Sequence, residues 1–279
     1  MAVTNFIPEV WSKKLLKIFD KNAVMRPLVN TDYEGEIKNA GDVVKVRTFG
    51  DVDVNSYTRD MTISFQALTD PMQELTINQQ KYFAFKVDDM DKAQSDVKIL
   101  EGYTGRGAIA IRNVVDASLL SHYADAHADN IIGTSGAPIA LTASNIYSYI
   151  TQLGEALDNK NIDADGRALV VTPRIRRKLL NSTEFTRATS LGDKVVQNGY
   201  IGHVAGFNVH VSTNMAAVSG AYPLMAFTKD FISFASQVDK VEHVRPYNMF
   251  ADAVKGLYLY GSKVFLPEAG AVLWDSNAA

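Results

Sequence analysis

The sequence contains no cysteine, which excludes disulfide bonds and thiolate metal sites. Histidines are few, five in all, and the HExxH pattern of zinc hydrolases does not occur. No run of about 18 apolar residues is present, so we expect no transmembrane helix and no membrane partner. The first residues lack a basic segment followed by an apolar one, so we expect no signal peptide.

An excess of positive charge is also missing. The 28 Lys and Arg residues and the 31 Asp and Glu residues leave a formal net charge of -3, which argues against a dedicated nucleic-acid binder. The phosphate-loop, dinucleotide-loop and nucleophile-elbow patterns are absent as well, and nothing marks a Ser, a His and an Asp as a triad. We therefore expect no catalytic residues and no cofactor. What is present is a chain of 279 residues, 47% hydrophobic, enough for one large domain or two small ones.

Residues 80–127 are the stretch around which the rest is organised. They begin with alternating apolar and polar residues that predict a strand, with Phe83, Phe85 and Val87 on one face. Apolar residues then recur at spacings of three and four and predict a helix over about 91–127, roughly 50 Å long. We expect a bend or break in this helix, because it contains three glycines: Gly102, Gly105 and Gly107.

An acidic cluster separates the predicted strand from the predicted helix. Asp88, Asp89 and Asp91 could bind a hard cation through their carboxylates. However, the loop pattern of an EF-hand is absent, and Asp91 is well placed to cap the helix. Capping is the simpler interpretation, so we predict no metal site.

The two segments before this stretch suggest structures that extend away from a core. Residues 1–40 carry an apolar set at helical spacing that includes Phe6 and Trp11, either in a helix docked on its own domain or in an arm laid on a neighbouring subunit. Residues 41–87 predict a long hairpin, with a first side around Val44 and a far side running from Leu75 to Val87. Because an isolated two-stranded ribbon is marginal in water, it lies on another subunit or folds back onto its own sheet.

The second half of the chain predicts a small α/β lobe followed by more strands. A turn-rich crossing at 128–142 leads to an amphipathic helix near 146–157 and a short buried strand at 168–171. Thr172 and Pro173 are expected to begin a further helix. From Asp230 onward the chain reads mostly as strand, which we expect to return beside the long helix.

The densest basic cluster of the sequence falls on that further helix. Arg174, Arg176, Arg177 and Lys178 are compatible with a solvated face, an inter-subunit ion-pair patch, or contact with DNA phosphates.

Several motifs, in their order, resemble one protein family. FKVDDMDKAQ at 85–94 precedes the predicted long helix, NFIPEVWSKKLL opens the chain at 5–16, and NGYIG at 198–202 is followed by AGFNV at 205–209. Together they resemble the major capsid proteins of tailed bacteriophages with the Hong Kong 97-type fold. The resemblance implies an α+β fold with four parts: an N-terminal arm (1–40), an extended β-hairpin loop (41–87), a spine-helix peripheral domain (88–140 and 228–279) and an α/β axial domain (141–227).

The resemblance also implies a function. The chain would self-assemble through pentamers and hexamers into an icosahedral shell that encloses double-stranded DNA, and would reside in the virion after assembly in the host cytoplasm. For the inter-subunit interface we select aromatic and arginine side chains in the projecting segments, the types enriched at binding hot spots: Phe6, Trp11, Arg47, Tyr57 and Arg59.

The same resemblance also suggests partners for the chain and alternative functions. Because the arm-like sequence begins at residue 6, we expect a separate scaffolding protein or a processed chain, together with a portal protein and non-specific contact with packaged DNA. One alternative is the shell protein of an encapsulin nanocompartment, which has the same kind of fold. The other is a metal-dependent α/β enzyme with its site at Asp88–Asp91.

Overall fold

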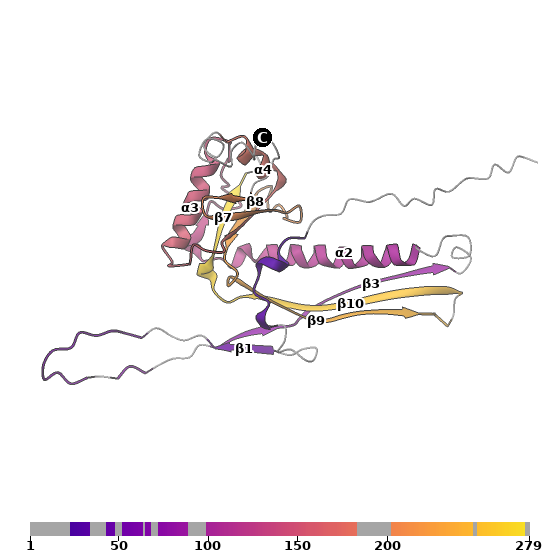
Figure 1. The fold of residues 1–279 in the computed structure, drawn as a ribbon, viewed down its shortest axis with the longest axis horizontal. Coiled ribbons are helices and arrows are strands. Elements are labelled where there is room, and N and C mark those ends of the chain that lie inside the picture. Colours follow the sequence, from indigo (N-terminus) through magenta and orange to yellow (C-terminus); the bar gives the residue numbers. More distant parts are fainter. Residues whose placement is uncertain are drawn as a thin grey trace, which may run out of the picture.

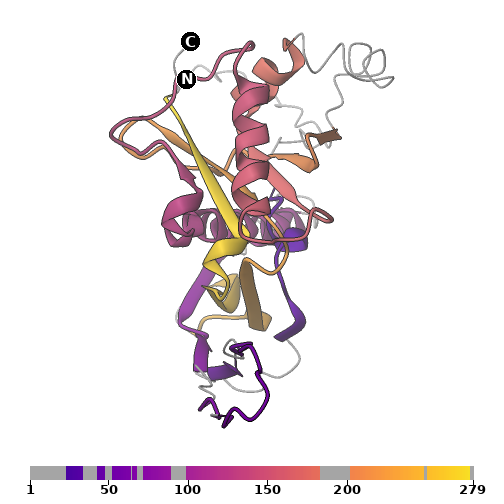
Figure 2. The ribbon, with the colours of Figure 1, turned by 90° about the vertical axis from the view of Figure 1, so that its left-hand side faces the viewer.

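The residues that the structure describes form three sheets, and one long helix runs from the upper lobe along the body of the molecule (Figure 1). The computed structural model describes residues 23–33, 43–47, 52–63, 65–67, 72–88, 99–182, 202–247 and 250–276. Seen from the side in Figure 2, the upper lobe, which carries the helix α3 (Ile146–Asp158), lies at one end, and the hairpin of the chain's first third lies at the other. Among the described residues, no helix is both long and apolar enough to cross a membrane.

The long helix α2 (Ile99–Leu120) lies over a three-stranded antiparallel sheet of order β3-β10-β9. Its strands are β3 (Gln79–Asp88), β10 (Ala251–Val264) and β9 (Ile232–Val244). Alternate residues of β3 are covered and exposed, as predicted, and the ring of Phe83 faces the helix. The helix is unbroken through its glycines, so the predicted bend or break is wrong.

Close packing accounts for one of those glycines. A Cβ at Gly107 would lie 2.8 Å from the Phe83 ring, so the helix and the sheet approach each other here as only glycine permits. The helix also ends before the predicted residue 127 and continues as the 3-10 helix η3 (Ser121–Asp125). The expected cap Asp91 and the first turns at 91–98 lie outside the described residues.

The hairpin is closed by different strands from those predicted. β1 (Val43–Arg47) pairs antiparallel with β2 (Met72–Thr76), and Val44 lies opposite Leu75. β3 belongs to the other sheet, where it pairs with β10 from Gln79 to Asp88. The far side of the hairpin, predicted to run from Leu75 to Val87, is therefore divided between two strands, β2 and β3. The alternating pattern continues across their junction, so periodicity alone cannot show that the chain changes its partner there.

A six-stranded sheet of order β4-β11-β8-β5-β7-β6 forms the core of the upper lobe. Three of its strands are buried or nearly buried along their length: β5 (Ala168–Val171), β8 (Tyr222–Phe227) and β11 (Gly270–Asp275). The sheet ends at β4 (Ile131–Ile132) on one side and at β6 (His203–Val204) on the other, and β7 (Phe207–Val211) lies between β5 and β6. The helix α3 (Ile146–Asp158) packs against β11 through buried residues that include Leu153 and Leu157.

The helix α4 (Pro173–Leu180) follows β5 directly, as predicted from Thr172 and Pro173. The Thr172 hydroxyl accepts a hydrogen bond from the Ile175 N–H at 3.5 Å, and Pro173 occupies the first helical position. Three short 3-10 helices complete the connections: η1 (Arg26–Leu28), η4 (Ala128–Asn130) and η5 (Pro267–Ala269).

The C-terminal strand lies where the sequence did not place it. We expected residues 228–279 to return as a whole beside the long helix. β9 and β10 do so, but β11 enters the six-stranded sheet between β4 and β8. All six of its residues are buried, so the sheet of the upper lobe is completed from the end of the chain.

Candidate inter-subunit interface

The loop between β1 and β2 exposes most of its apolar side chains. All residues described between 52 and 67 are exposed, so the loop is not folded back on its own sheet, and Figure 1 shows it extending away from the body. Val54 and Phe65 are 96% and 95% exposed. The other exposed large apolar side chains of this loop are Val52, Tyr57, Met61 and Ile63. Such a concentration on a projecting segment is typical of an interaction site, because single exposed apolar residues are normally scattered.

Local contacts shape the loop from within. The Asp53 N–H donates to the Gln66 side-chain oxygen at 2.8 Å and joins the two limbs. At the far end the Met61 N–H donates to the Thr58 carbonyl at 3.2 Å, and Asp60 adopts a left-handed φ of 67°. Asp tolerates this conformation better than most residues, which allows a tight turn.

The base of the hairpin is held firmly against the body. Leu75, fully buried, packs with Val44 and Ile77 onto Ala235 of β9 and Leu259 of β10. The Gln73 amide donates to the Phe265 carbonyl at 3.2 Å. β10 comes so close that a Cβ at Gly261 would lie 2.4 Å from the Thr76 carbonyl oxygen. A packed base with a solvent-exposed tip gives the loop a defined direction.

The interface residues selected from the sequence are distributed unevenly. Tyr57 lies in the loop and is 69% exposed, and Arg59 is exposed at its turn. The backbone of Arg47 ends β1, opposite Met72, and its side chain lies outside the description. Phe6 and Trp11 lie outside the described residues. Whether these five residues contact a neighbour stays a prediction.

The selection made from the sequence does not include the most exposed apolar residues of the same loop. Val54 and Phe65 are more exposed than Tyr57. The sequence could have indicated both residues, since each is an apolar residue within a largely polar stretch. The selection favoured tyrosine and arginine on hot-spot statistics and passed over them.

A second exposed apolar set lies at the turn from β9 to β10. Tyr247 is fully exposed and Phe250 is 83% exposed. Figure 1 places this turn at the opposite end of the long axis from the loop. The molecule therefore presents apolar side chains at both of its extremities.

Buried Asp116 joins three separate parts of the chain. One of its oxygens, Oδ1, accepts hydrogen bonds from the Val24 and Met25 N–H groups at 2.8 and 2.7 Å. The other oxygen, Oδ2, accepts from the Asn214 amide at 2.8 Å and from the Ser212 hydroxyl at 3.3 Å. The carboxylate thus fixes the start of the described chain and a loop of the upper lobe onto α2.

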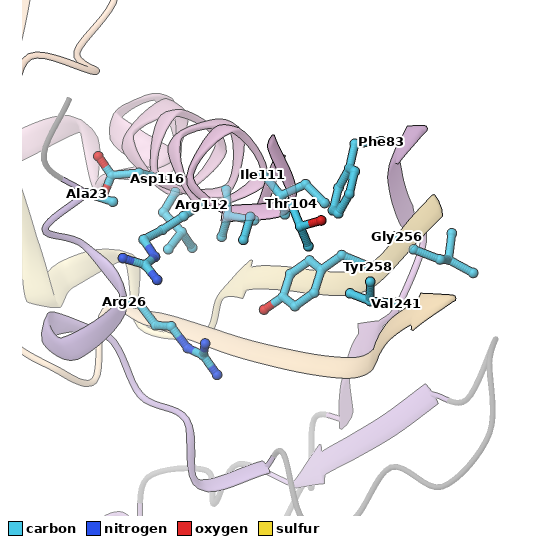
Figure 3. A pocket seen from close by; sticks show the side chains of 14 residues that line it. Ala23, Arg26, Phe83, Thr104, Ile111, Arg112, Asp116, Val241, Gly256 and Tyr258 are labelled. Carbon is cyan, nitrogen blue, oxygen red and sulfur yellow. The ribbon is translucent and has the colours of Figure 1, made fainter. Parts of the chain in front are cut away.

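A pocket of about 150 Å³ lies between α2 and the sheet below it (Figure 3). Ala23 and the guanidinium groups of Arg26 and Arg112 lie at one end, and Phe83 and Gly256 lie at the other. The wall is mostly apolar and includes five residues that recur along one face of α2 at spacings of three and four: Thr104, Ala108, Ile111, Val115 and Leu119.

The basic cluster on α4 is smaller than its sequence suggests. Lys178 is buried, and its ammonium donates to the Leu141 carbonyl at 2.7 Å. Burial lowers the pKa of Lys178, while the negative charge of buried Asp275 opposes that shift. Arg176 and Arg177 are exposed. The prediction of a fully solvated face is therefore wrong for Lys178, whose side chain is buried and bonded to the protein interior.

One Asp–His–Ser chain of hydrogen bonds does occur. His122 Nδ1 lies 2.7 Å from Asp125 Oδ2, and His122 Nε2 lies 2.8 Å from Ser262 Oγ. The order resembles that of serine hydrolases. Here, however, Ser262 belongs to the regular ladder of β9 and β10, opposite Phe234, and not to the sharp turn that presents a nucleophile. The contact joins η3 to β10.

The acidic cluster is only partly visible. Asp88 is exposed at the end of β3, while Asp89 and Asp91 lie outside the described residues. Within the described ranges, no group of three potential metal-ligating side chains gathers.

Comparison with solved structures relates this arrangement to phage particles. No family model matches the sequence, and no curated protein matches it. A structure from Mycobacterium phage Che8 is 28% identical and superposes with a TM-score of 0.83, covering 98% of both chains. The capsid structure of cyanophage P-SCSP1u gives a TM-score of 0.82 at 16% identity, over 98% of this chain and 94% of that one.

A third similar structure, the capsid of an empty GTA particle, gives a TM-score of 0.72 at 12% identity, over 96% of this chain and 94% of the other. These matches extend over nearly the whole chain, including the projecting loop, the long helix on its three-stranded sheet and the six-stranded lobe. The α+β architecture predicted from the sequence motifs is confirmed. The resemblance to tailed-phage major capsid proteins that the motifs indicated is confirmed, because the chain has the fold of these phage and capsid structures over nearly its whole length.

Proposed function

We propose that this major capsid protein has a purely structural role and self-assembles through pentamers and hexamers into an icosahedral shell around double-stranded DNA. The observation that carries the proposal is the projecting loop, whose base is packed on the body while its apolar tip is exposed to solvent. In a shell each such loop lies on the adjacent subunit. The four-part division into arm, hairpin loop, peripheral domain and axial domain belongs to this proposal, with β11 joined to the axial sheet.

The free energy gained by burying the apolar side chains of the loop is too small for one loop contact to hold two subunits together stably. Burying Val52, Val54, Met61, Ile63 and Phe65 would contribute roughly 7–15 kcal/mol, at about 1.5–3 kcal/mol per side chain. Association costs about 4–15 kcal/mol in lost freedom alone. A single loop contact is therefore near balance, and stable assembly requires several contacts per subunit that act together. The apolar β9–β10 turn and the N-terminal arm with Phe6 and Trp11 would supply the others.

The proposed partners follow from the same role. A scaffolding protein and a portal protein would direct assembly in the host cytoplasm, and packaged DNA would contact the shell without sequence preference. On α4, exposed Arg176 and Arg177 can meet phosphates, whereas buried Lys178 cannot.

Deleting residues 50–70 tests the proposal. We expect a chain that folds, because the base of the hairpin and both larger sheets remain, but that forms no closed particles in sedimentation and negative-stain microscopy. A finer pair of variants separates apolar contact from loop length. Val54→Ser with Phe65→Ser should prevent assembly, whereas the polar exchange of Asn55→Ser with Ser56→Asn should not.

Intact particles from the deletion variant would refute the role of the loop. Particles of the unaltered chain would also distinguish the two shell functions, since enclosed nucleic acid indicates a virus and an enclosed enzyme indicates an encapsulin.

A further inference from the structure

The two limbs of the projecting loop keep the register of the ladder at its base. β1 and β2 pair so that position 44 lies opposite position 75. The same register, carried outward along both limbs, sets position 53 opposite 66 and position 58 opposite 61. Both pairs are in contact, since the Asp53 N–H donates to the Gln66 side chain at 2.8 Å and the Met61 N–H donates to the Thr58 carbonyl at 3.2 Å. The described parts of the loop therefore continue the hairpin in register.

This register gathers the apolar side chains of the loop on one face. Side chains of an extended chain alternate between two faces, and residues directly opposite each other share a face. Val54 is set opposite Phe65, so these two share a face, and Val52, Met61 and Ile63 fall on it by alternation. The other face carries one tyrosine among polar side chains: Asp53, Asn55, Tyr57, Thr62 and Gln66.

The three-stranded sheet has one face covered by α2 and one open face. The ring of Phe83 faces α2, so Tyr82 lies on the opposite face, which we call the outer face, together with its ladder partner Leu257. Val244 of β9 falls on the outer face as well, because it pairs with Ala253, which alternates in phase with Leu257. Tyr82 is 78% exposed, and Leu257 and Val244 are each 41% exposed. These three apolar side chains form an open patch, the outer patch.

The other end of the outer face already binds this kind of hairpin within the chain. Leu259 alternates in phase with Leu257, and the base of the hairpin packs on it through Val44 and Leu75. By the same alternation, the apolar face of the loop is the outward continuation of the face that carries Val44 and Leu75. The contact within one chain thus shows which face of the hairpin fits the outer face of the sheet.

The loop of the same chain does not reach the outer patch. In Figure 1 the loop extends from its base away from the β9–β10 turn, whereas the outer patch lies between that base and that turn. Figures 1 and 2 also show the hairpin on the side of the sheet away from α2, the side toward which the outer face is directed. A second copy placed beside the first along the long axis therefore presents its outer patch to this loop.

We propose that the loop docks by its apolar face alone, and that the surface it covers is the outer patch of a second copy. The inference rests on the proposed shell function and names the two surfaces that would meet in it. The polar face of the loop then stays toward solvent. Tyr57 therefore contributes less to the contact than Val54, Ile63 or Phe65, although hot-spot statistics favour tyrosine.

Site-specific photo-crosslinking distinguishes the two faces of the loop. p-Benzoylphenylalanine replaces Ile63 on the apolar face or, as the matched control, its neighbour Thr62 on the polar face, in the full chain under assembly conditions. Chains labelled with heavy nitrogen are mixed with unlabelled chains, so mass spectrometry separates crosslinks between copies from crosslinks within one copy. We expect the Ile63 probe to link to the outer face of another copy, around Tyr82 and Leu257. The Thr62 probe should give at most one third of that yield.

A substitution on the receiving surface provides the second measurement. Tyr82→Asp places a charge in the outer patch and should lower the Ile63-probe yield at least threefold. Tyr103→Asp is the matched control, because Tyr103 is 56% exposed on α2 and contacts Phe85 on the other side of the sheet. This control should keep most of the yield.

Four results would each overturn the proposal: equal yields from the two probes, links only within single chains, links to other surfaces, or equal losses for the two Tyr→Asp variants. Particle formation is scored separately by negative-stain microscopy. Particles whose Ile63 probe misses the outer patch would overturn the docking and leave the shell function standing. Links to the outer patch in oligomers that never close would support the docking and count against the shell.

Discussion

Replacing Asp116 should test whether one buried carboxylate holds the parts of the subunit together. The side chain is only 2% exposed and accepts four hydrogen bonds, two of them from the backbone N–H groups of Val24 and Met25. Asp116→Ala removes all four acceptor contacts and leaves buried donors without a partner. Each such donor costs about 1–3 kcal/mol. Allowing for relaxation and non-additivity, we expect a loss of about 4–6 kcal/mol, against a typical total stability of about 5–15 kcal/mol.

Asp116→Asn is the informative intermediate. Its remaining oxygen can still accept from Val24 and Met25, but its new amide group faces the Asn214 amide, which donates to Oδ2 in the native chain. Two donors then oppose each other unless the Asn214 amide turns over and gives up its contact with Asn113 at 3.4 Å. We expect a smaller loss, of about 1–3 kcal/mol.

Urea unfolding of the unassembled chain measures these differences. The chain has two tryptophans, so a Trp11→Phe background leaves Trp274, buried against Tyr123 with ring centres 5.3 Å apart, as the reporter. Asp165→Asn, on an exposed turn, is the control and should change stability by less than about 0.5 kcal/mol. A loss below about 1 kcal/mol for Asp116→Ala, or equal losses for Ala and Asn, would refute the reasoning.

Two further predictions concern packing and protonation. Gly105→Ala should stabilise the chain by about 0.5–1 kcal/mol, because the added Cβ meets open space. Gly107→Ala should destabilise the chain, because the added Cβ meets the Phe83 ring at 2.8 Å, and Phe83→Leu should relieve that loss. Thermal melts measure all of these changes. Burial lowers the pKa of His210, so below about pH 6.5 the unfolded chain binds more protons and stability falls as the pH falls. His210→Gln should make the free energy of unfolding depend less on pH between about pH 7 and pH 5, as measured by urea titrations. An unchanged pH dependence in this variant would contradict the prediction.

Elements whose signals are local were predictable from the sequence. α3 follows from its apolar spacing, β5 from a continuous apolar run, and the start of α4 from Thr172 and Pro173. In each case the residues that specify the element lie within it or next to it. The order of the motifs was sufficient to predict the fold, which the solved structures confirm.

Features that depend on distant partners were not predictable. Which strand pairs with β3 is decided by β10, more than 160 residues away in the chain. The close packing at Gly107 involves Phe83 from another strand, and the ammonium of buried Lys178 donates to the carbonyl of Leu141. The pattern of a single segment contains none of this information. Only in α2 did intrinsic propensity point the other way, since glycine is a weak helix former.

The positions of the exposed apolar sets constrain how subunits can associate. The loop presents Val54 and Phe65 at one end of the long axis, and the β9–β10 turn presents Tyr247 and Phe250 at the other. A contact in which either set meets a different surface on the neighbouring copy is heterologous. Such heterologous contacts form rings when the rotation between copies closes, and open filaments when it does not. The fixed base of the hairpin limits that rotation, so weakening the Leu75 cluster should produce irregular or open assemblies before it unfolds the subunit.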